Sequence, residues 1–242
     1  MSETPRLTRR KAITYALVAA IAALTLWLGH GWWAASWKPD AARWPGGGVA
    51  IGPDDVPVNW ERLALDGVAF AYLDATAGAR TAFPAYTAEH DAALAAGIRT
   101  GAIHRFDVCT MASEQAAAFV RLVPREAPAL PPAVLVEADE GCERRPTRAL
   151  LLSELTTFLT QVETHLGKPA VIGVSDDLQS EYDLAAALNR PLWVTSPRTE
   201  PDPELTDWAI WLANDRLSVD GVAGPARWLV ANDRTPATGE GQ

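Results

Sequence analysis

An uncharged apolar run of 18 residues, Ala12–Gly29, follows directly on a basic cluster at the start of the chain. At 1.5 Å per helical residue, the run covers about 27 Å, close to the hydrocarbon thickness of a bilayer. No charged residue marks a solvent face, which disfavours a buried helix of a soluble domain. We therefore expect residues 12–33 to form a transmembrane anchor. The alternative is a removed signal peptide, which the length of the run and the poor cleavage site after it disfavour.

The distribution of charge predicts which side of the membrane each part occupies. The first twelve residues sum to +3 and the whole chain to −9, which leaves −12 for the remainder. Basic residues stay on the cytoplasmic side, and tryptophans such as Trp32 and Trp33 favour the membrane interface. We expect a single-pass protein of the inner (cytoplasmic) membrane, with residues 1–11 inside and the domain in the periplasm or another extracytoplasmic space. An acidic domain is unsuited to nucleic acid, which needs a basic surface.

The exported part is expected to hold one domain, with a Pro/Gly-containing linker (34–47) before it and a polar, disordered tail (235–242) after it. Between them, residues 48–234 are enough for a sizeable core.

Short apolar runs alternate with amphipathic ones along this domain. The pattern predicts strands at 68–73, 100–106, 133–138, 170–174, 192–195, 208–212 and 226–230, and helices at 86–96, 112–122, 147–166 and 181–188. Gly97 and Gly167 are suited to ending two of the helices. Apolar strands of this kind belong to parallel sheets covered by helices, so we predict an α/β fold, most simply a (β/α)-barrel-like single domain.

Four segments, in order and at suitable spacing, resemble the family 25 glycoside hydrolases, the lysozyme-type muramidases. They are Val49–Ile51 with Val58–Trp60, Gly67–Gly78 (like "GVxFxYIKATEG"), Ala96–His104 (like "AGLxxGAYHF") and Leu130–Glu137 (like "LPPxLDxE"). The resemblance covers roughly residues 48–233. It implies a barrel fold and peptidoglycan as substrate or ligand.

Several acidic positions of the family hold neutral or basic residues in this chain. The resemblance places Ala50, Leu135 and Ala77 where family members carry acids, and Arg227 at the aspartate of a "VDxN" motif. Of the family's Asp-x-Glu pair only Glu137 remains. Glycoside hydrolysis needs an acid to protonate the leaving oxygen and a second negative group, which in this family orients the N-acetyl group of the substrate.

Glu137 is the candidate general acid, because it follows an apolar strand where partial burial would raise the pKa of its carboxyl group. Asp74 is the candidate second carboxylate, since Tyr72, Asp74 and Thr76 are expected to share the lumen face of one strand. A structural role is also open for both acids, because His104 or Arg105 could pair with either.

The candidate substrate-binding residues lie on or just after the expected strands, where barrel enzymes build their sites. They are Tyr72, His104, Asp107, Asp139 and Trp193, of which His104 has a site-lining counterpart in the family. The spacing of His and Cys indicates no metal site, and no motif indicates a cofactor.

The two cysteines, Cys109 and Cys142, follow consecutive barrel strands in the fold that the resemblance implies. Both would lie on the same rim, close enough for a bridge, so we predict a disulfide between them. Count alone leaves two buried thiols as an alternative.

Three functions remain open from the sequence. The first is a membrane-anchored, lysozyme-like protein directed at peptidoglycan. The second is a non-catalytic relative that binds glycan or a protein in the same groove. The third is a structural module with a protein partner in an envelope complex.

Overall fold

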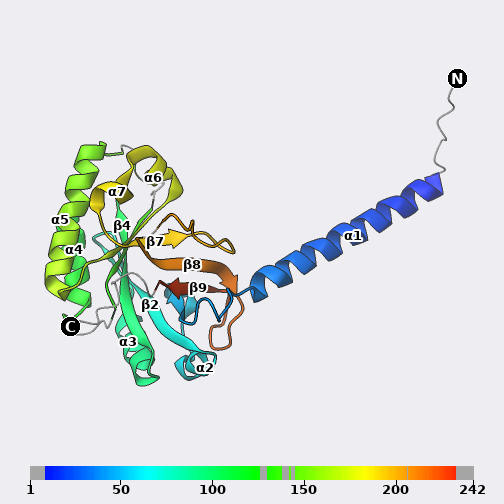
Figure 1. Ribbon diagram of the computed structural model, residues 1–242, viewed down its shortest axis with the longest axis horizontal. Helices are drawn as coiled ribbons and strands as arrows, with labels where there is room; N and C mark the ends of the chain where they lie inside the picture. The colour runs from blue at the N-terminus through cyan, green and yellow to red at the C-terminus, as the bar shows by residue number, and fades with distance from the viewer. Residues whose placement is uncertain (1–8, 126–129, 138–141, 143–144, 206, 233–242) are drawn as a thin grey trace.

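The computed structural model describes residues 9–125, 130–137, 142, 145–205 and 207–232. A long N-terminal helix, α1 (Arg9–Ser36), projects from a single α/β domain (Figure 1). The domain is a sheet rolled into a closed barrel with helices around it.

Within the described residues, eight strands close the barrel and a short ninth pairs antiparallel with the end of β2. The strands are β1 (Gly47–Ile51), β2 (Val68–Ala77), β3 (Thr81–Ala82), β4 (Arg99–Asp107), β5 (Ala133–Glu137), β6 (Val171–Val174), β7 (Leu192–Thr195), β8 (Trp208–Leu217) and β9 (Ala226–Ala231). The sheet order is β1-β9-β8-β7-β6-β5-β4-β2-β3, and the pairing of β1 with β2 closes it. Strand β9 runs antiparallel to both of its neighbours, and the other ring pairs are parallel. The predicted α/β barrel is confirmed.

The helices lie outside the barrel and cover its strands (Figure 1). They are α2 (Trp60–Leu65), α3 (Tyr86–Ala95), α4 (Ala112–Leu122), α5 (Arg148–Leu166), α6 (Asp176–Tyr182) and α7 (Leu184–Leu188), with a 3-10 turn at Pro53–Asp55. The helix predicted at 181–188 is in fact two helices, because Asp183 adopts a left-handed φ of 46°. The side-chain oxygen of Gln179 accepts hydrogen bonds from the backbone of Leu184 and Ala185, which starts α7 afresh.

Two apolar layers follow from the alternation of side chains along the strands. The outer layer joins strands to helices and includes Leu73, Phe106 and Phe158. The inner layer fills the lumen and includes Phe70 and Ile103. The barrel is therefore a packed core with its open end where the parallel strands finish, as in other barrels of this type.

An irregularity in β2 changes which side chains face the lumen. The register between β2 and β4 shifts between Asp74 and Thr76. Thr76 consequently points outward, where its hydroxyl lies 2.7 Å from Nδ1 of His104. The prediction that Thr76 shares the lumen face with Tyr72 and Asp74 is wrong, because a strict two-residue period does not survive a bulge.

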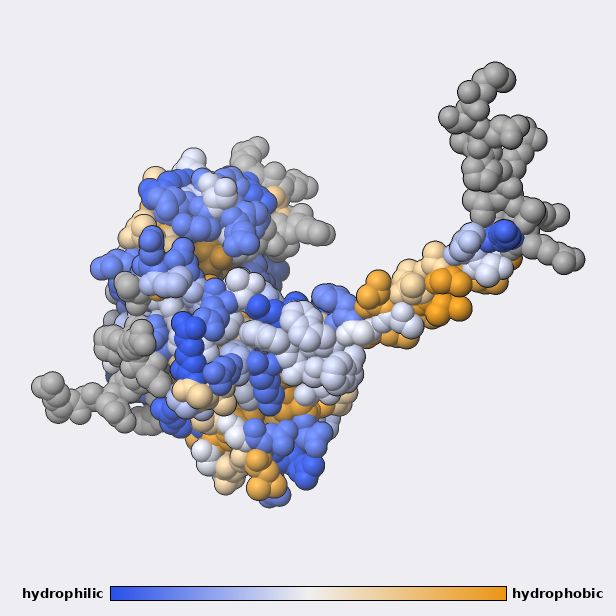
Figure 2. Space-filling view, turned by 45° about the vertical axis from the view of Figure 1, so that its right-hand side comes forward, coloured by the Kyte–Doolittle hydropathy of each residue, from blue (hydrophilic) through white to orange (hydrophobic). Residues whose placement is uncertain are grey.

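Helix α1 is apolar and almost uncovered by the rest of the chain. The side chains of Leu26 and Trp27 are 74% and 71% exposed. Figure 2 shows hydrophobic residues along this helix, in contrast to the mainly hydrophilic surface of the domain. The stretch Ile13–Ser36 is long and apolar enough to cross a membrane.

The segment after α1 lies along the barrel wall rather than free in solvent. The ring of Trp37 lies 6.3 Å from that of Trp211, and the ring of Trp44 lies 5.5 Å from that of Trp208. Residues 34–36, the start of the predicted linker, belong to α1. The linker predicted at 34–47 is therefore largely part of the folded domain.

Candidate functional site

Two concavities open at the end of the barrel where the parallel strands finish. One has a volume of about 980 Å³ and is lined by the loops after β2 and β4. The other, of about 620 Å³, lies over β5, β6 and β7. Both are lined by Arg105 and Glu137, so this pair of side chains forms the boundary between them.

Charged side chains form a chain across the mouth. Arg105 donates from Nη1 to both carboxylate oxygens of Glu137, at 3.0 and 3.2 Å, and from Nη2 to Oδ2 of Asp74 at 3.1 Å. Arg227 lies 3.8 Å from the same oxygen of Asp74 and 3.5 Å from Asp55. Two guanidinium groups thus connect three carboxylates.

Asp74 is the deepest member of this chain, with a side chain only 2% exposed. A buried carboxylate is costly unless it is paired, and two guanidinium groups meet that need at Oδ2. Its other oxygen, Oδ1, has no hydrogen-bond partner among the described residues. Gly52 leaves the space for this arrangement, because a β-carbon there would lie 2.9 Å from both the Asp74 carboxylate and the Arg227 guanidinium.

The carboxylates of Asp74 and Glu137 stabilise the positive charge of Arg105. Burial alone would lower the pKa of Arg105, but the carboxylates of Asp74 and Glu137 outweigh it and raise the pKa above its ordinary value. The guanidinium is therefore a permanent cation between two anions.

The surroundings of Glu137 differ from those expected of a general acid. We expected partial burial to raise the pKa of its carboxyl group, but the side chain is 54% exposed. Both of its oxygens accept hydrogen bonds from Nη1 of Arg105, so the carboxylate is occupied by this ion pair rather than directed at a ligand.

The second candidate carboxylate, Asp74, lies on the far side of the same guanidinium group. Glycosidases keep the gap between their two carboxylates for the scissile bond and the attacking water. In this chain the Arg105 guanidinium occupies the gap between Glu137 and Asp74.

Tyr72 and Trp193 meet in the lumen below this chain of charges. Their rings lie 5.2 Å apart, edge to face, and both residues are buried. Burial raises the pKa of Tyr72, so its phenol is neutral. Trp193 lines the 620 Å³ concavity, whereas Tyr72 lies among the residues that fill the lumen.

His104 faces away from the mouth, so the prediction that it lines the site is wrong. It is fully buried on the helix side of β4, where its ring stacks on Phe158 with centroids 4.4 Å apart. Burial lowers its pKa to about 4. Its Nε2 lies 3.1 Å from Oε1 of Gln115, which can only accept, so Nε2 carries the proton and Nδ1 accepts from Thr76.

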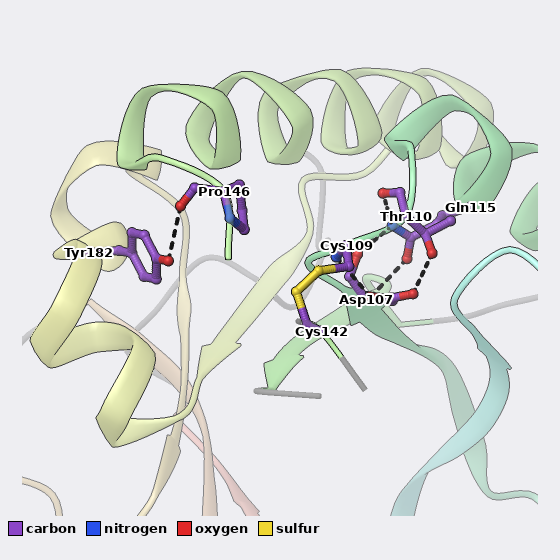
Figure 3. The surroundings of a disulfide bond; sticks show 7 residues. All are labelled: Asp107, Cys109, Thr110, Gln115, Cys142, Pro146 and Tyr182. Carbon is purple, nitrogen blue, oxygen red and sulfur yellow. Dashed lines mark hydrogen bonds between the residues drawn. A yellow bond between two sulfur atoms is a disulfide. The ribbon is translucent and has the colours of Figure 1, made fainter. Parts of the chain in front are cut away.

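Asp107 organises the loop after β4. It accepts hydrogen bonds from the backbone of Cys109 and from the Thr110 hydroxyl, while Gln115 bonds to its backbone on both sides (Figure 3). Asp107 lines the 980 Å³ concavity, as expected of a residue on the rim. Asp139, another predicted binding residue, lies outside the described residues.

The predicted disulfide between Cys109 and Cys142 is confirmed, with the two α-carbons 5.9 Å apart (Figure 3). It joins the loops that follow β4 and β5, the strands that carry Arg105 and Glu137. The bond therefore links Cys109, just after β4, to Cys142, which follows β5, on one side of the mouth.

Sequence reasoning did not find the full role of the arginines. Arg105 was one of two alternatives for pairing with the acids, and the structure shows that it pairs with both. The resemblance marks Arg227 only as the replacement of a family aspartate, whereas in the structure its guanidinium lies in the mouth beside Asp74. In the described part of the chain no group of His, Cys, Asp and Glu has the arrangement of a metal site.

A closed barrel of mostly parallel strands with charged side chains at its open end defines a protein of the barrel class whose sites lie at that end. The model of the glycosyl hydrolases family 25 matches residues 54–222. The chain belongs to this family.

Similar proteins agree with this assignment. The chain is 28% identical over 182 residues to YegX, an uncharacterised protein of Escherichia coli K12, covering 72% of this chain and 65% of YegX. It thus spans just under two thirds of that relative. The solved structure of a family 25 glycosyl hydrolase from Bacillus anthracis has a TM-score of 0.72 at 24% identity, covering 82% of this chain and 94% of the other. The bacterial lysozyme from Streptomyces coelicolor has a TM-score of 0.68 at 21% identity, with 77% and 92% covered. These two likenesses show the fold.

Proposed function

We propose that this protein is anchored in the cytoplasmic membrane by α1 and binds a peptidoglycan-type glycan in the barrel mouth without cleaving it. The observation that carries the proposal is the position of Arg105. Its guanidinium lies between Glu137 and Asp74 and bonds to both. The groove remains, but the Arg105 guanidinium fills the space between the two carboxylates that hydrolysis would need.

The shape of the mouth supports a glycan as ligand. Two concavities, of about 980 and 620 Å³, flank the Arg105–Glu137 pair, so a ligand can occupy both sides of it. Trp193 and the rim carboxylates supply the mixture of aromatic and polar groups that fixes a ligand in such clefts. Solved structures with the same fold are described as lysozymes and muramidases.

The chemistry of the mouth argues against hydrolysis at the rate of a lysozyme. The reaction needs a protonated acid on one side of the scissile bond and a second negative group on the other. Glu137 is held in an ion pair with Arg105, and Asp74 is shared by Arg105 and Arg227. While these ion pairs persist, Glu137 is not available as the acid and Asp74 is not available as the second negative group.

The membrane part of the proposal rests on α1. Its uncovered apolar side chains need a partner that hides them from water, and a bilayer suits the length of the stretch Ile13–Ser36. The basic segment 1–11 favours the cytoplasm, which puts the barrel outside, where peptidoglycan lies.

Hydrolysis is the second candidate, and the exposure of Glu137 favours it. The side chain is 54% exposed at the boundary of both concavities, so a bound sugar could displace Arg105 from it. Glu137 would then act as the general acid and Asp74 as the second carboxylate.

The two candidates are separated with the full-length chain in detergent micelles and labelled, insoluble peptidoglycan. Co-sedimentation measures binding, and release of reducing ends measures cleavage. We expect the parent chain to bind and to release no more reducing ends than buffer. Trp193→Ala should weaken the binding, and Glu61→Gln, on the exposed face of α2, should leave it unchanged.

Release of reducing ends that disappears in Glu137→Gln would establish hydrolysis instead. Absence of binding by the parent chain would refute both candidates.

A further inference from the structure

The C-terminal end of α1 is fixed to the barrel by hydrogen bonds. The side-chain amide of Asn214, which is fully buried, donates to the carbonyls of Ala34 and Trp37 at 2.7 and 2.8 Å. The backbone N–H of Ser218 donates to the carbonyl of Ala35 at 2.8 Å. Carbonyls at the end of a helix have no partners within it, so these bonds from β8 and the loop after it complete α1.

The other side of Asn214 is fixed as well. Its Oδ1 accepts from the Arg198 guanidinium at 2.9 Å and from the backbone of Arg216 at 3.0 Å. A buried amide with every donor and acceptor satisfied has one orientation, so the junction between α1 and β8 is rigid.

The junction lies at the mouth end of the barrel. The last residue of β7, Thr195, is paired with Leu212, and Asn214 follows two residues later on β8. Opposite it on β9 is Trp228, next to Arg227, whose guanidinium belongs to the mouth. Figure 1 shows the arrowhead of β8 beside the C-terminal end of α1.

From this junction the chain runs down the outer wall, away from the mouth. The amine of Lys38 lies 4.2 Å from the ring of Trp228. Further along, Trp44 packs on Trp208, at the opposite end of β8, and Gly47 then begins β1. The C-terminal end of α1 is therefore attached to the barrel at its open end.

We propose that the mouth of the barrel is held at the membrane surface and takes the glycan of a polyprenyl-diphosphate-linked amino-sugar precursor. This rests on the proposed function, which supplies the glycan and the membrane. Only the β8–β9 wall separates the end of α1 from Arg227 in the mouth. A glycan tethered to lipid in the same bilayer meets such a groove at a high effective concentration, because neither partner diffuses away from the surface.

The orientation is tested by energy transfer to a headgroup-labelled acceptor lipid in vesicles that hold the full-length chain. Both native cysteines form the disulfide, so one added cysteine carries the donor dye. Thr195→Cys labels the mouth end, and Thr164→Cys labels the exposed last turn of α5 at the opposite end. We expect stronger transfer from position 195. Equal transfer, or stronger transfer from 164, would refute the orientation.

The ligand is tested with two forms of one glycan. Vesicles contain the parent chain with a polyprenyl-diphosphate-linked disaccharide-pentapeptide, and the same disaccharide-pentapeptide is offered free in solution. We expect the lipid-linked form to bind at least about tenfold more tightly. An insertion of about 20 Gly/Ser residues between Trp33 and Ala34 makes a flexible coil and should remove most of this advantage. The same Gly/Ser segment added after Gln242 is the matched control and should keep it.

Equal affinity for the two forms, or an advantage that survives the insertion, would refute the inference and leave the proposed function intact. Failure to bind either form while the chain still co-sediments with insoluble peptidoglycan would likewise refute the inference alone, whereas absence of that co-sedimentation would refute the proposed function itself.

Discussion

His104 is a buried base whose neutrality makes the stability of the fold depend on pH. Its ring is fully buried against Phe158, with Nε2 donating to Gln115 and Nδ1 accepting from Thr76. Burial lowers its pKa from the ordinary 6.5 to about 4. In the unfolded chain the imidazole takes up a proton near pH 6.5, whereas in the folded chain it stays neutral down to about pH 4.

The direction of the pH dependence follows from proton binding by the folded and unfolded states. Between these two values the unfolded state holds more protons, so acid favours unfolding. The stability that His104 contributes is complete above pH 6.5 and is lost as the pH falls towards about 4. At about 1.4 kcal/mol for each pH unit, the whole interval corresponds to about 3 kcal/mol.

The assay is urea unfolding of the full-length chain in a non-ionic detergent, followed by tryptophan fluorescence between pH 7.5 and 4.5. The comparison variant is His104→Gln, whose side-chain amide can still donate to Gln115 but does not titrate. All other ionisable groups are shared, so the difference between the two pH slopes belongs to His104. We expect the parent to lose about 2–3 kcal/mol more than the variant over this range. Equal slopes, or an imidazole that titrates near pH 6.5 in the folded chain by NMR, would refute the reasoning.

Three further changes test the mouth of the barrel itself. Replacing both Cys109 and Cys142 by serine should lower the free energy of unfolding by about 3–4 kcal/mol, because the bond closes a loop with a sequence separation of 33; a denaturation midpoint unchanged under non-reducing conditions would contradict this. Arg105→Met should cost about 2 kcal/mol in a urea titration, because it removes the nearest cation of buried Asp74, and adding Asp74→Leu should restore most of it; a neutral single variant would show that the pair is not needed. Gly52→Ala should weaken co-sedimentation with peptidoglycan while far-UV circular dichroism stays unchanged, because its β-carbon would lie 2.9 Å from Asp74 and from Arg227 and would displace the ends of both side chains; unchanged binding would mean that the ion pairs do not shape the groove.

The fold was largely predictable from local patterns. The strand at 192–195 and the helix at 112–122 have the predicted bounds, since each is a short, clearly bounded apolar or amphipathic run. Helix α2 was missed because six residues carry too little periodicity; Asn59 starts it by accepting from the backbone of Arg62 at 3.0 Å.

The candidate site was less predictable, because it depends on which face each side chain takes. His104 and Arg105 are neighbours on one strand, so only one can face the lumen, and that one is Arg105. The resemblance to the family favoured His104. The position of Arg227 depends on the antiparallel register of β9, a long-range pairing that the local sequence does not encode.

The pairing of β1 with β9 has a consequence for how the protein is made. The ring closes between the first strand and the last, so its final hydrogen bonds wait for residues 226–231. During synthesis from the N-terminus the earlier strands can assemble only as an open sheet with unpaired edges. A chain that lacks this stretch would leave the edges of β1 and β8 without their partner strand.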